Sequence, residues 1–198
     1  LLFASDAART GARTQPLGMS RFGNFIRPRV GLLLALGFFG PAIAPAAITV
    51  ASFNVENYTL LPDGRVLTVD AWGSSATASE IYDPVTQQWT SAGSTQVVLT
   101  DSGSKEQGPA ILRPDGTVFY FGANGAGAGH TSIYNTSTGL WTAGPDYPGT
   151  DNAADAPAAP LPNGNILTQA SSGVFVSPSR WYEIDYTTNA FTQVSSPP

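Results

Sequence analysis

Cysteine is absent from the 198 residues of this chain, which excludes a disulfide framework, a thiolate metal site and a cysteine nucleophile within them. Charged residues are scarce as well, because they make up 12% of the chain, about half the usual share of a soluble protein. Glycine and proline are plentiful, with 21 and 16 residues. Few charges and many turn-forming residues are typical of short strands joined by tight turns. The composition therefore predicts an all-β fold.

Basic residues are few beyond the first thirty positions. Residues 1–30 hold five arginines and one acid, a net charge of +4, whereas the rest of the chain holds four basic and thirteen acidic residues, a net charge of −9. A protein body of that charge repels phosphate backbones. We therefore expect no binding to nucleic acid.

A leader is predicted over residues 19–47, "MSRFGNFIRPRVGLLLALGFFGPAIAPAA". Three arginines precede a short apolar run, and small residues follow it, which is the pattern of a secretory signal peptide. The alternative is an uncleaved membrane anchor over residues 30–47, although Pro41 and Pro45 interrupt that stretch. We expect a secreted, periplasmic or cell-surface protein without stable membrane insertion after cleavage.

Residues 1–18 precede the single methionine, Met19, and resemble upstream sequence read through, so we exclude them from the fold. The remaining part, 48–198, divides into three similar units of about fifty residues. Their approximate bounds are 56–107, 108–155 and 156–198.

Each unit begins with the same hairpin, written "LLPDGRVLTV", "LRPDGTVFYF" and "PLPNGNILTQ". Proline favours the first turn position, Asp or Asn caps the turn, and glycine takes the positive φ that closes it. The expected turn residues are Asp63, Gly64, Asp115, Gly116, Asn163 and Gly164.

A second motif lies further along each unit, as "YDPVTQQW", "YNTSTGLW" and "IDYTTNAF". The Asp or Asn at its second place is expected to form an Asx turn, and these residues are Asp83, Asn135 and Asp185. The aromatic residue at its eighth place is interpreted as packing between neighbouring sheets, and these residues are Trp89, Trp141 and Phe191.

A period near fifty residues with four strands in each unit is typical of a β-propeller blade of the kelch type. The run "LLPDGRVLTV…SEIYDPVTQQWTSAG" closely resembles bacterial kelch repeats and the propeller repeats of the galactose oxidase superfamily. The resemblance implies a kelch-type β-propeller of about three four-stranded blades. Closed propellers have about four to eight blades, so we expect an incomplete ring, a fragment of a longer propeller. The alternative is a ring closed by association of several chains.

Alternating strand directions place the tight turns at one end of each unit and the long connections at the other. Binding residues tend to lie on longer loops held by a rigid scaffold, so we expect the binding site at the long-loop end. The candidate binding residues there are Trp72, His130, Tyr147, Asp151, Asp155, Arg180 and Trp181. The same end also carries Asp101, Lys105, Glu106 and Asp146.

Each candidate also has a purely structural interpretation. His130 can be a hydrogen-bonded structural histidine. Asp146, Asp151 and Asp155 can be solvated loop acids or ligands of Ca²⁺, although their spacing matches no EF-hand. Exposed aromatic rings such as Trp72 and Tyr147 are expected to stack on sugar rings.

These patterns favour an exported, non-catalytic binding module that presents its long loops to a glycan or protein partner, without a cofactor. The resemblance implies an alternative, a fragment of a galactose oxidase-like copper radical oxidase. That family's cofactor needs a Cys–Tyr pair and two histidines, and this chain has no cysteine and one histidine. The active-site residues of the alternative would therefore lie outside this chain. A sialidase-like glycosidase is disfavoured because the arginine cluster for a substrate carboxylate is missing.

Overall fold

The computed structural model describes residues 56–71 and 77–197, which belong to one compact unit, Ala44–Pro198. The expected leader, residues 1–18 and the candidate Trp72 lie outside the described residues. Within the described part, no helix is long and apolar enough to cross a membrane.

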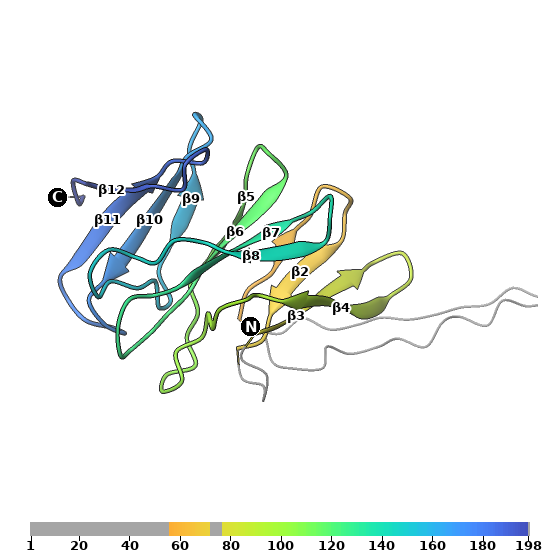
Figure 1. Cartoon of the computed structure of the whole chain (residues 1–198), viewed down its shortest axis with the longest axis horizontal. Coiled ribbons are helices and arrows are strands. Elements are labelled where there is room, and N and C mark those ends of the chain that lie inside the picture. Colours follow the sequence, from red (N-terminus) through yellow and green to blue (C-terminus); the bar gives the residue numbers. More distant parts are fainter. Residues whose placement is uncertain (1–55, 72–76, 198) are drawn as a thin grey trace, which may run out of the picture. The chain divides into compact units, whose positions relative to one another are not determined.

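Three four-stranded antiparallel sheets make up the fold, and the described residues contain no helix. In each sheet the strands lie in chain order, as the colours of Figure 1 show. The first sheet contains β1 (Thr59–Leu60), β2 (Val66–Val69), β3 (Ala78–Asp83) and β4 (Gln88–Ser94). The second contains β5 (Ala110–Leu112), β6 (Thr117–Phe121), β7 (Thr131–Asn135) and β8 (Leu140–Ala143). The third contains β9 (Ala158–Pro160), β10 (Ile166–Ser171), β11 (Ser179–Ile184) and β12 (Phe191–Val194).

The all-β prediction with three four-stranded units is confirmed. The described sheets do not close a ring.

The hairpin that opens each sheet turns at a glycine with positive φ. The φ values are +85° at Gly64, +78° at Gly116 and +89° at Gly164. The side-chain oxygen of the residue before each glycine accepts a hydrogen bond from the N–H of the residue after it, over 3.0–3.1 Å. Glycine adopts this conformation without the steric penalty that a Cβ brings, which explains why the repeat contains glycine here.

The turn between the third and fourth strand of each sheet is an Asx turn, which confirms the interpretation of the second motif. The Oδ1 atoms of Asp83, Asn135 and Asp185 each accept two backbone N–H groups, over 2.7–3.3 Å. The sixth residue of the motif is left-handed in all three units, with φ of 58° at Gln87, 71° at Gly139 and 61° at Asn189.

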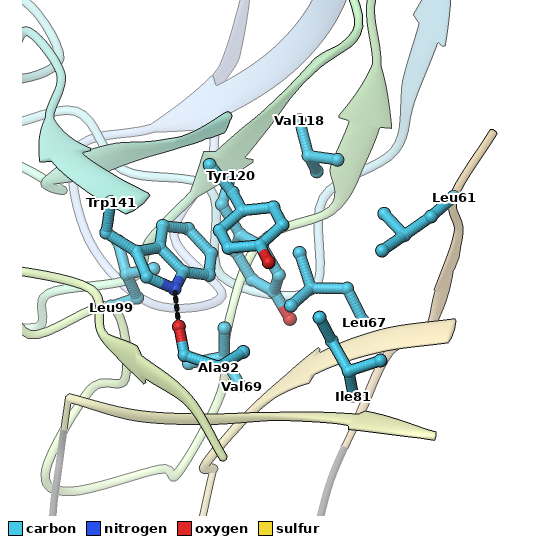
Figure 2. Packing of buried hydrophobic residues seen from close by; sticks show 10 residues of the cluster. Leu61, Leu67, Val69, Ile81, Ala92, Leu99, Val118, Tyr120 and Trp141 are labelled. Atoms are coloured by element: carbon cyan, nitrogen blue, oxygen red, sulfur yellow. Dashed lines mark hydrogen bonds between the residues drawn. The ribbon is translucent and has the colours of Figure 1, made fainter. Parts of the chain in front are cut away.

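Hydrophobic side chains fill the space between the first and second sheets (Figure 2). Leu67 and Ile81 of the first sheet lie in one cluster with Tyr120 and Trp141 of the second. The Trp141 indole N–H donates to Ser79 Oγ at 2.9 Å and to the carbonyl oxygen of Ala92 at 3.1 Å. Trp141 therefore lies between two neighbouring sheets and hydrogen-bonds across them.

A second hydrophobic cluster joins the second and third sheets. Phe119 and Phe121 of β6 belong to it together with Ile184 of β11. Half-buried Phe191 packs against it, with its ring 4.7 Å from that of Tyr147. The third aromatic residue of the motif, Trp89, is half-buried and contacts the rings of Tyr58 and Tyr82 in its own sheet.

Because consecutive strands are antiparallel neighbours, the tight turns of every sheet share one end, and the long connections share the other. The connections at the long-loop end run over 95–109 between the first two sheets and 144–157 between the second and third. The long loops of neighbouring sheets therefore come together at this end.

Candidate functional site

His130 lies at the long-loop end, where its ring is paired with a carboxylate. Its Nδ1 atom is 2.7 Å from Asp146 Oδ1, and both side chains are exposed, by 38% and 53%. A cavity of about 160 Å³ beside the pair is lined by His130, Asp101 and Asn124, among others. The Asp101 carboxylate is engaged within the protein, because it accepts hydrogen bonds from the backbone N–H groups of Ser104 and Gly125 at 2.7 Å each. These bonds, led by that from Ser104, hold the pKa of Asp101 below its usual value.

Asp151 and Arg180 form an ion pair in which the carboxylate is buried and the arginine is partly exposed. The Arg180 Nη1 group donates to Asp151 Oδ1, and the hydroxyl of Tyr182 donates to Oδ2 at 2.7 Å. The Asp151 side chain is 3% exposed. Burial, followed by the neighbouring carboxylate, raises the pKa of Tyr182 to about 12, so its hydroxyl stays a donor. The three groups satisfy one another and fasten the connection 144–157 to β11.

Tyr147 is a core residue, which corrects the expectation of an exposed ring. It is 2% exposed and belongs to the cluster between the second and third sheets. Its hydroxyl lies 3.2 Å from Thr168 Oγ1. Its neighbours cover the ring, so it cannot stack on a sugar in this conformation. Another aromatic candidate, Trp181 in the third unit, is half-buried in β11.

The three acids considered for Ca²⁺ are not brought together. Asp146 pairs with His130, Asp151 with Arg180, and Asp155 lies at a separate cleft. Among the described residues, no group of three or more His, Asp or Glu residues is placed to hold a metal ion.

The cleft at Asp155, which we call the acidic cleft, lies where the segments leading into β1, β5 and β9 meet. It has a volume of about 200 Å³. Its lining residues are Glu56, Asn57, Gln107, Gly108, Pro109, Asp155 and Ala156. Because the first strand of each sheet begins here, the cleft collects groups from the segments that lead into all three sheets.

The floor of the acidic cleft is a closed hydrogen-bond network. The Gln107 side-chain amide donates to Asp70 O and to Thr100 Oγ1, both at 2.7 Å, and Gln107 is 3% exposed. Asn57 donates to the carbonyl oxygen of Gly108 at 2.9 Å and accepts the hydroxyl of Tyr120. Burial raises the pKa of Tyr120, so this hydroxyl remains a donor. Such a network holds the floor rigid.

The carboxylates at the mouth of the acidic cleft are less engaged. Glu56 Oε2 accepts the N–H of Gln107 at 3.0 Å. Asp155 donates its backbone N–H to Gln107 O at 2.9 Å, whereas its carboxylate accepts no hydrogen bond from any described residue. Free carboxylate oxygens in a cleft are acceptors available to a ligand.

The electrostatics of the acidic cleft are negative. Burial, followed by the charges of Glu56 and Asp155, raises the pKa of Glu106. None of the described residues that line the cleft is a lysine, arginine or histidine. The cleft therefore favours ligands that donate hydrogen bonds and repels anions.

Sequence reasoning named Asp155 and Glu106 but missed Glu56. Each of the three lies a few residues before the first strand of a sheet, Glu56 before β1, Glu106 before β5 and Asp155 before β9. Comparing the residues just before each predicted first strand would have brought the three acids together.

Comparison with family models finds no match, and neither does comparison with curated proteins. Among solved structures, the chain is similar to a fungal alcohol oxidase of the AA5 family in complex with copper. The identity is 17% and the TM-score 0.50, over 68% of this chain and 29% of that one. It is also similar to a PL25 polysaccharide lyase, an ulvan lyase bound to -[GlcA(1-4)Rha3S]-, at 17% identity and a TM-score of 0.50. That match covers 71% of this chain and 39% of the lyase.

These likenesses concern the fold, and this chain spans less than two fifths of either protein. The copper site that the oxidase resemblance implies does not fit the residues present. The chain contains one histidine and no cysteine, and His130 is paired with Asp146.

Proposed function

We propose that this chain is part of an exported β-propeller of the kelch type, a binding module that holds an uncharged glycan at its acidic cleft. The observation that carries the proposal is the free carboxylate of Asp155, which lies beside Glu56 above a floor of satisfied polar groups. Export rests on the leader pattern in the sequence.

The arrangement of the sheets supports the propeller. Each of the three is a four-stranded meander, and neighbouring sheets share a hydrophobic cluster. The long connections meet at one end, which is where ligands are bound when loops carry the function.

The chemistry of the acidic cleft supports a glycan. Sugar hydroxyls donate hydrogen bonds, and bonds to a charged acceptor contribute about 1.5–3 kcal/mol each. Carboxylates that would repel a uronate or a sulfate accept neutral hydroxyls without a charge penalty. The ligand class that matches the carboxylates and the negative potential of the acidic cleft is therefore a neutral polysaccharide.

The test is binding of the full chain to an array of neutral glycans, such as xylan, galactan and β-glucan, with the Asp155→Asn variant alongside. Asparagine tolerates the left-handed φ of 49° at this position, so the variant is expected to fold. We expect at least about tenfold weaker binding, the equivalent of one charged hydrogen bond.

The matched control is Asp63→Asn, at the opposite end of the first sheet. It removes the same charge, and the third unit already has asparagine at the corresponding place, Asn163. Binding should survive in this control. Equal affinity of wild type and Asp155→Asn would remove the acidic cleft from the binding site.

A second candidate function is part of a copper radical oxidase, which rests on the fold likeness to the AA5 enzyme. Its copper ligands would lie beyond this chain. Its test therefore needs a polypeptide that includes those ligands, and stoichiometric copper binding by it, measured by calorimetry, would favour this alternative.

A further inference from the structure

In each of the first two sheets, two backbone carbonyl oxygens accept hydrogen bonds from the connection that leads to the following sheet. The turn hydrogen bonds from Leu61, Arg113 and Leu161 align the three units at their first hairpin, and the Asx residues align them at their second turn. By this alignment Asp70, Gly122 and Ala170 are equivalent, at the end of the second strand. Thr77, Gly129 and Ser179 are likewise equivalent, just before or at the start of the third strand.

In the first unit, the connection to the second sheet occupies both positions. The carbonyl oxygen of Asp70 accepts hydrogen bonds from the hydroxyl of Thr100 at 3.0 Å and from the side-chain amide of Gln107 at 2.7 Å. The carbonyl oxygen of Thr77 accepts the N–H of Thr95 at 2.9 Å.

In the second unit, the connection to the third sheet does the same. The carbonyl oxygen of Gly122 accepts the N–H of Ala153 at 3.2 Å, and that of Gly129 accepts the N–H of Tyr147 at 3.0 Å. In the first and second sheets, the connection to the following sheet therefore lies against the same place, between the end of the second strand and the start of the third. We call this place the groove of the sheet.

In the third unit, the equivalent groove is open. Ala170 and Ser179 line a cavity of about 280 Å³. Phe175 and Val176 line it too, and they are 69% and 46% exposed. Leu167 is half-buried in the same sheet, whereas its equivalents Leu67 and Phe119 are fully buried between sheets. The third sheet thus presents the surface that the other two sheets use to receive a neighbour.

The first sheet presents the complementary surface. Tyr58, which immediately precedes β1, and Leu60 of β1 are 60% and 64% exposed. Their equivalents in β5, Ala110 and Leu112, pack against the cluster shared with the first sheet. Ala158, the equivalent of Tyr58 in β9, packs against the cluster shared with the second sheet. In the first sheet, the face that joins each later sheet to its predecessor is therefore exposed at Tyr58 and Leu60.

From these two surfaces we infer that the chain associates head to tail, with the first sheet of one copy packed on the third sheet of a second copy. Within one chain an interface of this kind occurs twice, between the first and second sheets and between the second and third sheets. A second copy is the occupant because, in a solution of this chain, it is the partner that carries the matching face.

The association bears on the acidic cleft. A second copy docked in this way brings its own Glu56 and Asn57 beside Asp155, as Gln107 and Gly108 now stand beside Glu56. The cleft would then continue from one copy into the next.

The first test is the mass of the purified full chain by sedimentation velocity over a range of concentrations. We expect assembly into dimers, and we expect Leu60→Lys to weaken it at least about tenfold, because a charge in the centre of an interface opposes burial. Leu140→Lys is the matched control, since Leu140 is 65% exposed but lies at the start of β8. It should leave the assembly unchanged. A monomer at every concentration would overturn the inference.

The absence of cysteine permits a second, position-specific test. Leu60→Cys and Leu167→Cys variants are prepared separately, mixed and oxidised. We expect disulfide-linked dimers that contain one chain of each kind. A mixture of Leu140→Cys with Leu167→Cys should give none. Equal cross-linking in both mixtures would show association through another surface and would likewise overturn the inference.

Discussion

Glu106, which precedes Gln107 of the acidic cleft in the sequence, illustrates how a single residue affects folding. Burial and the charges of Glu56 and Asp155 raise its pKa above 4.5, the value of an unperturbed glutamate. Between these two pKa values the folded protein binds more protons than the unfolded chain, so the free energy of unfolding falls as the pH rises through this window. Above the folded pKa the full loss persists. The ionised carboxylate is therefore destabilising at neutral pH.

We predict that Glu106→Gln raises the free energy of unfolding at pH 7 and leaves it unchanged near pH 4. The gain should stay below about 1 kcal/mol, because the side chain is only half-buried and solvent screens its charge. Thermal unfolding of both proteins at the two pH values measures it. An equal gain at both pH values would assign the effect to packing instead of charge.

At the residue scale, the sequence predicts local geometry well and long-range contacts poorly. Gly64 and Asp83 act within their own turns, so the order of neighbouring residues is enough to identify their roles. The residues around Tyr147 in the sequence are typical of an exposed loop. Its ring is nevertheless buried against residues of β11 and β12. The partners of Asp151 lie 29 and 31 residues away, which no local pattern encodes.

At the scale of elements, the Asp151 interactions decide how firmly the connection 144–157 is held. This connection carries both Asp155 at the acidic cleft and Tyr147 in the core. Its attachment to β11 is the ion pair with Arg180 and the hydrogen bond from Tyr182. An isolated bridge between Asn152 and Ser171 fastens it to β10 as well.

We predict that Asp151→Ala lowers the free energy of unfolding by about 1–3 kcal/mol, because it leaves the buried hydroxyl of Tyr182 without an acceptor. Asp151→Asn should lose less, since its amide oxygen still accepts that hydroxyl. Hydrogen exchange of residues 144–157 should become faster in the alanine variant.

The control for this prediction is Asp146→Ala, in the same connection. Its pair with His130 is exposed at both side chains, so the change should be below about 1 kcal/mol. Equal losses for Asp146→Ala and Asp151→Ala would contradict the assignment of Asp151 as the anchor.

The strands themselves follow from the repeat. Turn residues at fixed offsets delimit each strand, and the three units fold into three sheets of the same topology. The connections could not be predicted in the same way, because their paths are decided by backbone carbonyls of two different sheets, such as those of Asp70 and Gly122. For this reason only one residue of the acidic cleft, Asp155, was among the binding residues predicted from the sequence.

At the scale of the whole molecule, the charge distribution restricts the ligand more strongly than any single contact. Residues 31–198 carry a net charge of −9, and the acidic cleft adds local negative potential at the long-loop end. The net negative charge of the chain repels an anionic polymer at long range, and the carboxylates of the acidic cleft repel it on contact. This separates the proposed ligand from that of the PL25 lyase, whose bound sugar contains glucuronic acid.

We predict that the full chain binds neutral galactan with an affinity that changes little with salt, and that polygalacturonate, which has the same ring with a carboxylate, does not bind at low salt. Hydrogen bonds between neutral hydroxyls and a carboxylate involve no release of counterions, whereas repulsion between like charges is strongest when it is least screened. Calorimetric titrations of both polymers at low and high ionic strength provide the measurement. The Asp155→Lys variant should narrow the difference between the two, because it reverses one charge at the mouth of the cleft. Tighter binding of polygalacturonate than of galactan by the unmodified chain at low salt would mean that the ligand is held elsewhere, by basic groups such as Arg180.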